Sequence, residues 1–199
     1  MNMSGFGAKP AILRCGRCGR FVDWQDARLQ LVCGCRPHLE LPPVLVREAS
    51  ASDRVKALEL FRHVFRPAQL VSYGEAISLD EAAAFVAETD EGIAGALAWR
   101  PFDGALHILA LATDPMHQRA GVGGHLVAEA ELLARRQNWP RVIVTITNDN
   151  LPALYFYQRR GYRVSAILRD SIAAQTRDQK PMGFAGIPIL DEMQLAKEF

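Results

Sequence analysis

The sequence predicts an α/β (α+β) domain with a mixed, mostly antiparallel central sheet flanked by helices, preceded by a small cysteine-bearing module. Three observations predict this architecture. Residues 106–113 form an apolar, strand-like run that leads into a glycine-rich turn, and a helical pattern of apolar residues follows the turn. Strand-like segments lie on both sides of this unit. All four cysteines lie before residue 36, apart from the expected domain.

Composition narrows the class of protein. The chain has 199 residues, enough for one domain with a full core and a small additional module. The formal net charge is +1, so no global field favours nucleic acid or membranes as partners. There is no apolar run of membrane-spanning length, and the first residues lack the basic start and apolar core of a secretory signal. We therefore expect a cytoplasmic protein without a membrane partner.

The N-terminal cysteines have a spacing that favours zinc. They fall in two pairs, Cys15 with Cys18 and Cys33 with Cys35. Zinc prefers four soft ligands in a tetrahedron, and a C-x-x-C turn supplies two thiolates from one loop. Residues 20–24 and 28–32 could form two short strands, so the segment resembles a zinc ribbon. The alternatives are reduced structural cysteines or a disulfide, and His38 could replace one of the last two cysteines.

The prolines between residues 36 and 43 indicate a linker, so we expect a zinc-ribbon-like module with its linker at 1–43 and the larger domain at 44–199. The larger domain opens with a strand-like segment, 44–49. Ser50 or Ser52 can cap the helix that follows. The apolar face of this helix is expected to hold Val55, Leu58, Phe61 and Phe65. The alanine-rich stretch 79–85 has a helical pattern.

Three antiparallel strands are expected before the glycine-rich turn. Residues 85–88 and 93–100 form a hairpin pattern around a Thr-Asp-Glu-Gly turn, and residues 106–113 supply the third strand. Residues 141–147, after the helix, are rich in β-branched residues and apolar on both faces at their start. This predicts a central strand covered on both sides. The last strands of the sheet are expected to include residues 186–195.

The glycine-rich turn is the first candidate binding site. Gly121, Gly123 and Gly124 leave the backbone open to close approach by a ligand. The first turn of a helix has unpaired N–H groups and partial positive charge, which together favour phosphate oxygens. The turn lacks the Lys-Ser/Thr of a P-loop and the three-glycine spacing of a dinucleotide fingerprint.

Two motifs on the chain resemble those of one family. The spacing Gln118-x-x-Gly121-x-Gly123 resembles the pyrophosphate loop of the GNAT family, the acetyl-CoA-dependent N-acetyltransferases. Downstream, Asn150-x-x-Ala153-x-x-Phe156-Tyr157-x-x-x-Gly161-Tyr162 resembles the second motif of that family. The resemblance implies the GNAT fold across 44–199. It also implies direct acetyl transfer from acetyl-CoA to a primary amine of a small molecule or protein, in a ternary complex. Nucleic acid is not an expected partner, and a homodimer is left open.

The resemblance also assigns roles to residues. Backbone groups near Leu111 and Thr113 would bind the pantetheine arm in a gap between two central strands, and the glycine loop would bind the pyrophosphate. The expected cofactor-binding residues are Leu111, Thr113, Gln118, Arg119, Ala120, Gly121, Val122, Gly123, Gly124, Asn150, Ala153 and Tyr157. Arg159 and Arg160 could reach the adenosine phosphates, although a solvated basic helix end is the simpler interpretation.

Tyr157 and His107 are the expected catalytic residues. Tyr157 holds the position of the family's general acid, and a phenol of ordinary pKa near 10 stays protonated at neutral pH. His107 alternates with the residues from Leu109 to Thr113, which places it on their face of the strand, where an imidazole could accept the amine proton. Glu75 and Glu88 are alternative bases.

A second function remains open at this point. The chain could be a non-catalytic acyl-CoA-binding sensor or scaffold whose zinc module binds protein or nucleic acid. The pairing of the glycine loop with Asn150 and Tyr157 favours the enzyme, because a scaffold has no need of an acid at the thiolate.

Overall fold

The computed structural model describes residues 13–14, 21–22, 44–65, 69–72, 75–117, 121–174 and 181–199. The chain divides into two compact units. One contains Met1–Pro42 and Arg119–Gly121, and the other contains Pro43–Gln118 and Val122–Phe199.

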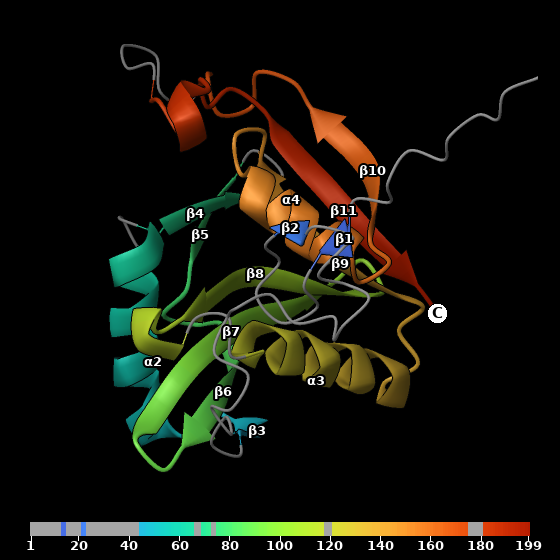
Figure 1. Ribbon diagram of the computed structural model, residues 1–199. Helices are drawn as coiled ribbons and strands as arrows, with labels where there is room; N and C mark the ends of the chain where they lie inside the picture. Colours follow the sequence, from blue (N-terminus) through green and yellow to red (C-terminus); the bar gives the residue numbers. More distant parts are fainter. Residues whose placement is uncertain are drawn as a thin grey trace, which may run out of the picture. The chain divides into compact units, whose positions relative to one another are not determined.

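The larger unit is built on a seven-stranded sheet with the strand order β10-β11-β9-β8-β7-β6-β3 (Figure 1). Its strands are β3 (Leu45–Glu48), β6 (Ala83–Thr89), β7 (Gly92–Phe102), β8 (Ala105–Thr113), β9 (Arg141–Thr147), β10 (Arg163–Leu168) and β11 (Glu192–Glu198). Only the β8–β9 pair is parallel, and every other pair in this sheet is antiparallel. The prediction of a mixed, mostly antiparallel sheet is confirmed.

Helices and a separate hairpin accompany the sheet. The elements are α2 (Ala51–Phe65), the hairpin of β4 (Gln69–Ser72) and β5 (Glu75–Ser78), the 3₁₀ turn η1 (Pro115–His117), α3 (Val122–Arg136), α4 (Leu151–Gln158) and the 3₁₀ turn η2 (Phe184–Gly186). α3 follows the glycine-rich turn and α4 follows Asn150, as the sequence predicts. Among the described residues, no helix is both long and apolar enough to cross a membrane.

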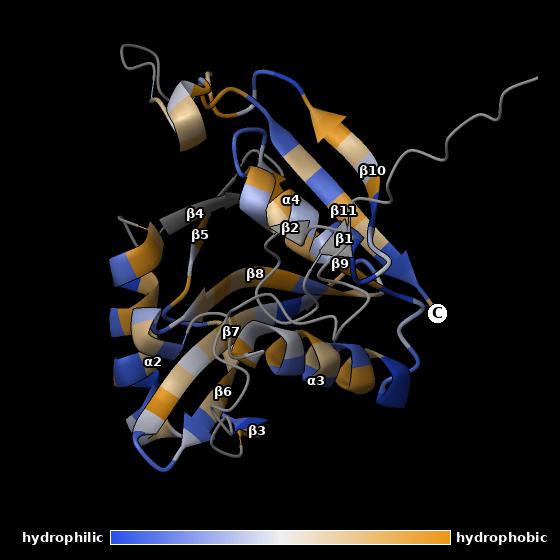
Figure 2. Ribbon diagram, viewed as in Figure 1, coloured by the Kyte–Doolittle hydropathy of each residue, from blue (hydrophilic) through white to orange (hydrophobic). Residues whose placement is uncertain are grey.

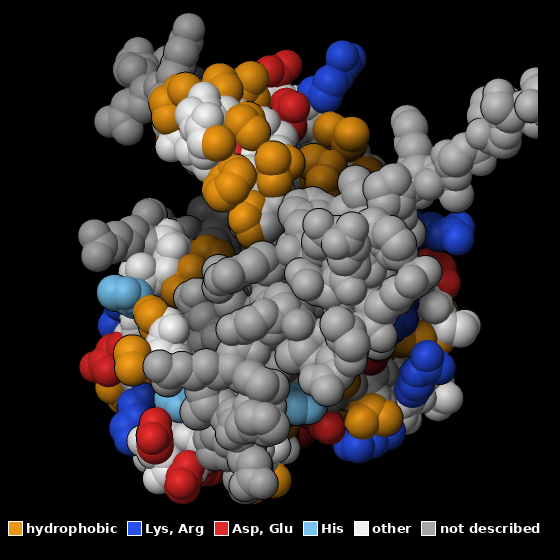
Figure 3. Space-filling view, in the orientation of Figure 1, with side chains coloured by type: hydrophobic (Ala, Val, Ile, Leu, Met, Phe, Trp, Pro, Cys, Tyr) orange, Lys and Arg blue, Asp and Glu red, His pale blue; other side chains and the backbone are white. Residues whose placement is uncertain are grey.

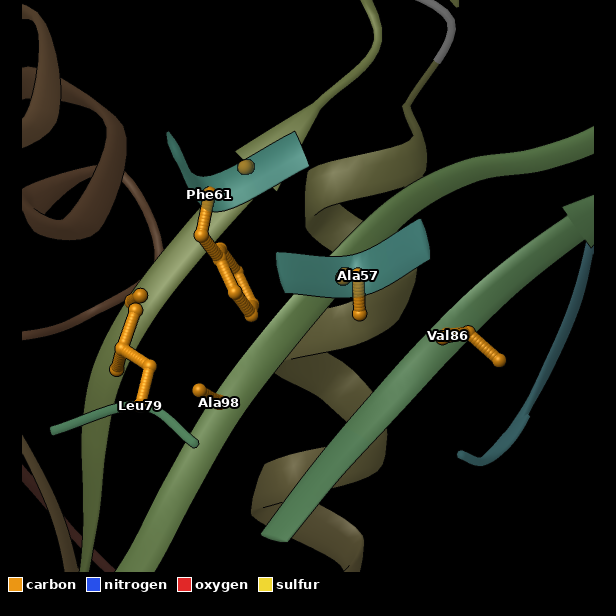
Figure 4. Packing of buried hydrophobic residues seen from close by; sticks show 8 residues of the cluster. Ala57, Phe61, Leu79, Val86 and Ala98 are labelled. Atoms are coloured by element: carbon orange, nitrogen blue, oxygen red, sulfur yellow. The ribbon is translucent and has the colours of Figure 1, made fainter. Parts of the chain in front are cut away.

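The two faces of the sheet are covered by different helices. Ala96 and Ala98 of β7 pack with Phe61 of α2 in one buried cluster (Figure 4). Gly95 points to the other face, where an added Cβ would lie 2.7 Å from Cγ1 of Val122 in α3. Because side chains alternate along a strand, α2 and α3 lie on opposite faces. Figure 2 shows apolar residues along β7 and β8, the strands that both helices cover.

The start of α2 is fixed by reciprocal hydrogen bonds. The Asp53 N–H donates to the Ser50 carbonyl oxygen at 3.1 Å, and the Ser50 N–H donates to Oδ2 of Asp53 at 2.8 Å. Arg47 donates to both Asp53 and Glu88, and its hydrogen bond to Asp53 holds the pKa of that carboxyl well below its usual range. This arrangement satisfies N–H groups that a helix start leaves unpaired. Glu88, which sequence analysis named as an alternative base, forms an ion pair with Arg47, with 2.9 Å between Oε2 of Glu88 and Nε of Arg47.

Two local predictions are wrong. Residues 79–82 form a turn and Ala83–Phe85 begin β6, where a helix was expected. These three residues pair with Trp99–Leu97 of β7, and this ladder outweighs the weak helical preference of the alanines. Val55 is 61% exposed, so it does not belong to the buried face of α2.

The smaller unit contains one described strand pair. β1 (Leu13–Arg14) and β2 (Phe21–Val22) are antiparallel, with Leu13 opposite Val22. Cys15 and Cys18 fall between these strands in the sequence. All four cysteines lie outside the described residues, as does the second expected strand, 28–32. Within the part of the chain that the structure describes, no group of His, Cys, Asp and Glu could hold a metal.

Phe61 is expected to be a main contributor to the core under α2. It is 1% exposed, whereas Val64 on the same helix is 46% exposed. Removing a buried phenyl ring costs about 3–5 kcal/mol, so Phe61→Ala should lower the free energy of unfolding in urea by that amount. Val64→Ala is the matched control and should change it by less than about 0.5 kcal/mol. Equal effects of the two variants would contradict the placement of α2.

Candidate active site

The two central strands separate partway along their length. β8 pairs with β9 only from Leu106 opposite Val142 to Ile108 opposite Val144. β7 continues to pair with β8 as far as Thr113, and β11 pairs with the whole of β9. In Figure 1 the β8 and β11 ribbons converge at one end and diverge at the other. The C-terminal halves of β8 and β9 therefore face each other without a ladder, as the family resemblance implies.

A β-bulge lies where the ladder ends. Ala98 pairs with Ala110 but Trp99 pairs with Ile108, so Leu109 is an extra residue in β8. Both Leu109 and Ala110 pack against the apolar cluster beneath α2, although consecutive strand residues normally face opposite sides. A bulge bends its strand and increases the local twist, which accounts for the departure of β8 from β9.

Because of the bulge, His107 lies on the opposite face of the sheet from the one predicted for it. His107 pairs with Arg100 and Leu111 pairs with Leu97, so the two lie on opposite faces of the sheet. The imidazole is 2% exposed and meets the Phe102 ring edge-on, with centroids 5.2 Å apart. Burial, with Arg100 and Arg141 nearby, lowers the pKa of His107 to about 4. It lies on the paired side of the bulge, away from the separated half.

On the α3 face, three elements meet beside the separated strands. A Cβ added to Gly123, in the first turn of α3, would lie 3.5 Å from Cζ of Phe156 in α4. The same position is 3.6 Å from Cδ2 of Leu111 in β8. Leu111 and Gly123, two expected cofactor residues, are thus close together. Phe156 lies next to Gly123 as well, although sequence analysis did not assign it to the site.

The glycine-rich turn is described in part. Gln118, Arg119 and Ala120 lie outside the described residues. Gly121 has φ +86°, the left-handed region that favours glycine. α3 begins at Val122, so the N–H groups of its first turn have no acceptor within the helix.

α4 begins at a side-chain cap and carries the expected acid. Asn150 Oδ1 accepts a hydrogen bond from the Ala153 N–H at 3.1 Å, and Gly161, at φ +89°, follows the helix. Both predicted helix ends are confirmed. Tyr157 is 4% exposed, and its ring meets those of Phe156 and Tyr162 edge-on, at centroid distances of 5.0 and 5.2 Å.

Burial raises the pKa of Tyr157 above its ordinary value, so its hydroxyl keeps the proton at neutral pH. A protonated phenol is able to donate its proton to a leaving anion.

The segment before β11 is attached to the end of β9. Asn148 Oδ1 accepts hydrogen bonds from the N–H groups of Leu190 and Asp191, at 2.9 and 3.0 Å, and its Nδ2 donates to the Pro188 carbonyl oxygen at 2.9 Å. In Figure 3 hydrophobic side chains gather over α4 and this segment. Met182 and Phe184 are 60% and 50% exposed there.

Comparison with known proteins identifies the family. The model of the acetyltransferase (GNAT) family matches residues 52–162. The chain is 34% identical over 113 residues to the uncharacterized protein YxbD of Bacillus subtilis (strain 168), across 55% of this chain and 69% of that protein. The chain therefore belongs to the acetyltransferase (GNAT) family.

Solved structures share the fold. The IAA acetyltransferase from Bacillus cereus ATCC 14579 is 19% identical with a TM-score of 0.62, covering 79% of this chain and all (100%) of that one. A GNAT family acetyltransferase from Elizabethkingia anophelis with acetyl-CoA bound is 20% identical with a TM-score of 0.59, covering 78% and 98%.

His107 should make stability depend on pH. Its folded pKa of about 4 lies below the ordinary 6.5, so the unfolded chain binds more protons between these values. The contribution is complete above pH 6.5 and is lost as the pH falls toward 4, by about 3 kcal/mol.

Urea unfolding of wild type and His107→Gln between pH 4 and 7.5 tests this, with His63→Gln, an exposed histidine of α2, as control. The His107 variant should show a smaller loss of unfolding free energy on acidification. Identical pH profiles for wild type and His107→Gln would contradict the account.

Proposed function

We propose that this protein is an acetyl-CoA-dependent N-acetyltransferase that moves the acetyl group to a primary amine by direct transfer in a ternary complex. The observation that carries the proposal is the separation of β8 from β9 beyond Ile108, with Leu111 of β8 and Phe156 of α4 both next to Gly123 of α3. Buried Tyr157 follows Phe156 in the same helix.

The described residues fit acetyl-CoA. In this proposal, unpaired backbone groups of β8 from Leu111 to Thr113 bind the pantetheine arm, and N–H groups from Gln118 to Gly124 bind the pyrophosphate. Gly123 supports this, because a side chain there would extend toward Phe156 and Leu111. Hydrogen bonds to charged groups contribute about 1.5–3 kcal/mol each, so several of them would hold the cofactor without a large basic patch.

The residues of the chain then assist amide formation. Bound acetyl-CoA supplies a thioester, whose carbonyl carbon is attacked by the neutral amine as the carbon–sulfur bond breaks. Tyr157 donates its phenolic proton to the departing sulfur. The amine loses a proton to water, since His107 lies on the opposite face of the sheet from Leu111. The pairing of the glycine loop with Asn150 and Tyr157 supports the enzyme over a non-catalytic acyl-CoA sensor, because a sensor has no need of an acid at the thiolate.

The proposal also covers the N-terminal segment. We infer that 1–43 is a zinc-ribbon-like module and 44–199 the catalytic domain. The β1–β2 pair supports this, because Cys15 and Cys18 fall in the connection between two antiparallel strands, where zinc-binding C-x-x-C turns occur.

Tyr157→Phe should lower kcat by about 10²–10⁴-fold, the usual contribution of general acid catalysis, while acetyl-CoA affinity stays unchanged. A screen of primary amines for release of free thiol first identifies an acceptor. Because burial raises the pKa of Tyr157, loss of activity through its ionisation should begin only above pH 10. Tyr155→Phe, a change on the same helix, is the matched control.

Unchanged turnover in Tyr157→Phe would show that another group protonates the sulfur. Acetyl-CoA binding without turnover on any amine would favour the sensor.

Protein purified without added zinc should contain about one zinc ion per chain, bound by Cys15, Cys18, Cys33 and Cys35. Metal analysis should show loss of zinc in Cys15→Ser and retention in Gly19→Ala, which changes the same segment without removing a ligand. Metal-free wild-type protein that does not take up zinc would contradict the proposal.

A further inference from the structure

Two adjacent arginines at the end of α4 lie in different surroundings. Exposed Arg159 donates from Nη1 to the Tyr155 hydroxyl at 3.0 Å, and its Cζ is 5.6 Å from the centroid of that ring. Arg160 is half-buried, and its Cζ lies 3.6 Å from the centroid of Phe156. The Arg160 guanidinium therefore lies directly over the Phe156 ring.

Arg160 reaches the first turn of α3. Its Nη2 is 2.7 Å from the position that a Cβ on Gly124 would occupy. Gly124 is the third residue of α3, so the guanidinium lies directly against the helix where N–H groups have no helical acceptor. The same Phe156 ring also lies next to Gly123.

The protein gives this cation little compensation. Its hydrogen bond within the described residues is from Nη1 to the Phe156 carbonyl oxygen, at 3.0 Å. No described carboxylate pairs with it, and Glu131, whose charge acts on it, is 2.6 Å from Nζ of Lys197. Burial lowers the pKa of Arg160.

The placement is also unfavourable toward α3, because the start of a helix carries partial positive charge. A half-buried guanidinium beside this end is stabilised by an anion that contacts both of them, because desolvation of an unpaired charge is costly. The planar fork of arginine matches phosphate geometry.

We propose that Arg160 is a phosphate-binding residue whose guanidinium binds the pyrophosphate of acetyl-CoA from the α4 side, opposite the N–H groups of α3. This inference rests on the proposed function. It distinguishes Arg160 from its neighbour Arg159, which is exposed and donates a hydrogen bond to Tyr155.

Isothermal titration calorimetry of the full-length protein tests the proposal. Arg160→Met keeps an unbranched side chain over Phe156 and removes the charge. It should weaken acetyl-CoA binding about 10- to 100-fold, and the slope of log Kd against log salt should fall. Arg159→Met is the matched control and should change Kd by less than about threefold.

Two further measurements identify the phosphate and guard against misfolding. Arg160→Met should weaken binding of 3′-dephospho-CoA by the same factor as binding of CoA, and leave binding of acetyl-pantetheine unchanged. Its melting temperature without ligand should equal or exceed that of wild type, because an unpaired cation is removed from the start of α3. Arg160→Lys, which keeps the charge but loses the fork, should bind with intermediate affinity and replaces the Met variant if that variant does not fold.

The outcomes separate the two proposals. Absence of acetyl-CoA binding by wild type would overturn the proposed function and this inference with it. Normal binding by Arg160→Met would overturn the inference alone. A loss seen with CoA but not with 3′-dephospho-CoA would assign Arg160 to the 3′-phosphate and overturn its placement on the pyrophosphate.

Discussion

One extra residue in β8 determines the geometry on which the candidate site depends. At Leu109 the strand changes register with β7, and its pairing with β9 ends at Ile108. Since β7 holds β8 as far as Thr113 and β11 holds the whole of β9, neither strand is free to close the gap. The opening is therefore built into the hydrogen-bonded sheet rather than into loops, which suits a site whose groups must be held in fixed positions.

Two glycines allow close approaches near this opening. Gly95 lets Val122 of α3 pack directly on β7, and Gly124 receives the Arg160 guanidinium. A side chain at Gly95 would push α3 away from the sheet, because its Cβ would lie only 2.7 Å from Val122. The first turn of α3 can therefore lie close to the sheet and to Arg160 because Gly95 and Gly124 have no side chains.

Most elements of the larger unit follow from the sequence, because apolar periodicity, the Asn150 cap and the glycine turn are local signals. The failures have non-local causes. A helix was expected at residues 79–85, but residues 83–85 pair with β7 instead. The face of His107 depends on a bulge in β8, which is defined by the register between β8 and β7. Arg159 and Arg160 each meet an aromatic ring four residues earlier, a spacing readable in sequence. Which of them faces α3 depends on the packing of α4.

Asn148 has a different consequence, one for the order of the segment before β11. The side chain of this residue, at the end of β9, holds the backbone of residues 188–191 through three hydrogen bonds. Beside it, Oδ2 of Asp149 accepts a hydrogen bond from the Phe184 N–H at 3.0 Å. Two neighbouring polar side chains therefore couple this partly exposed segment to the end of β9, so removing either one would loosen the segment without breaking a strand pair of the sheet.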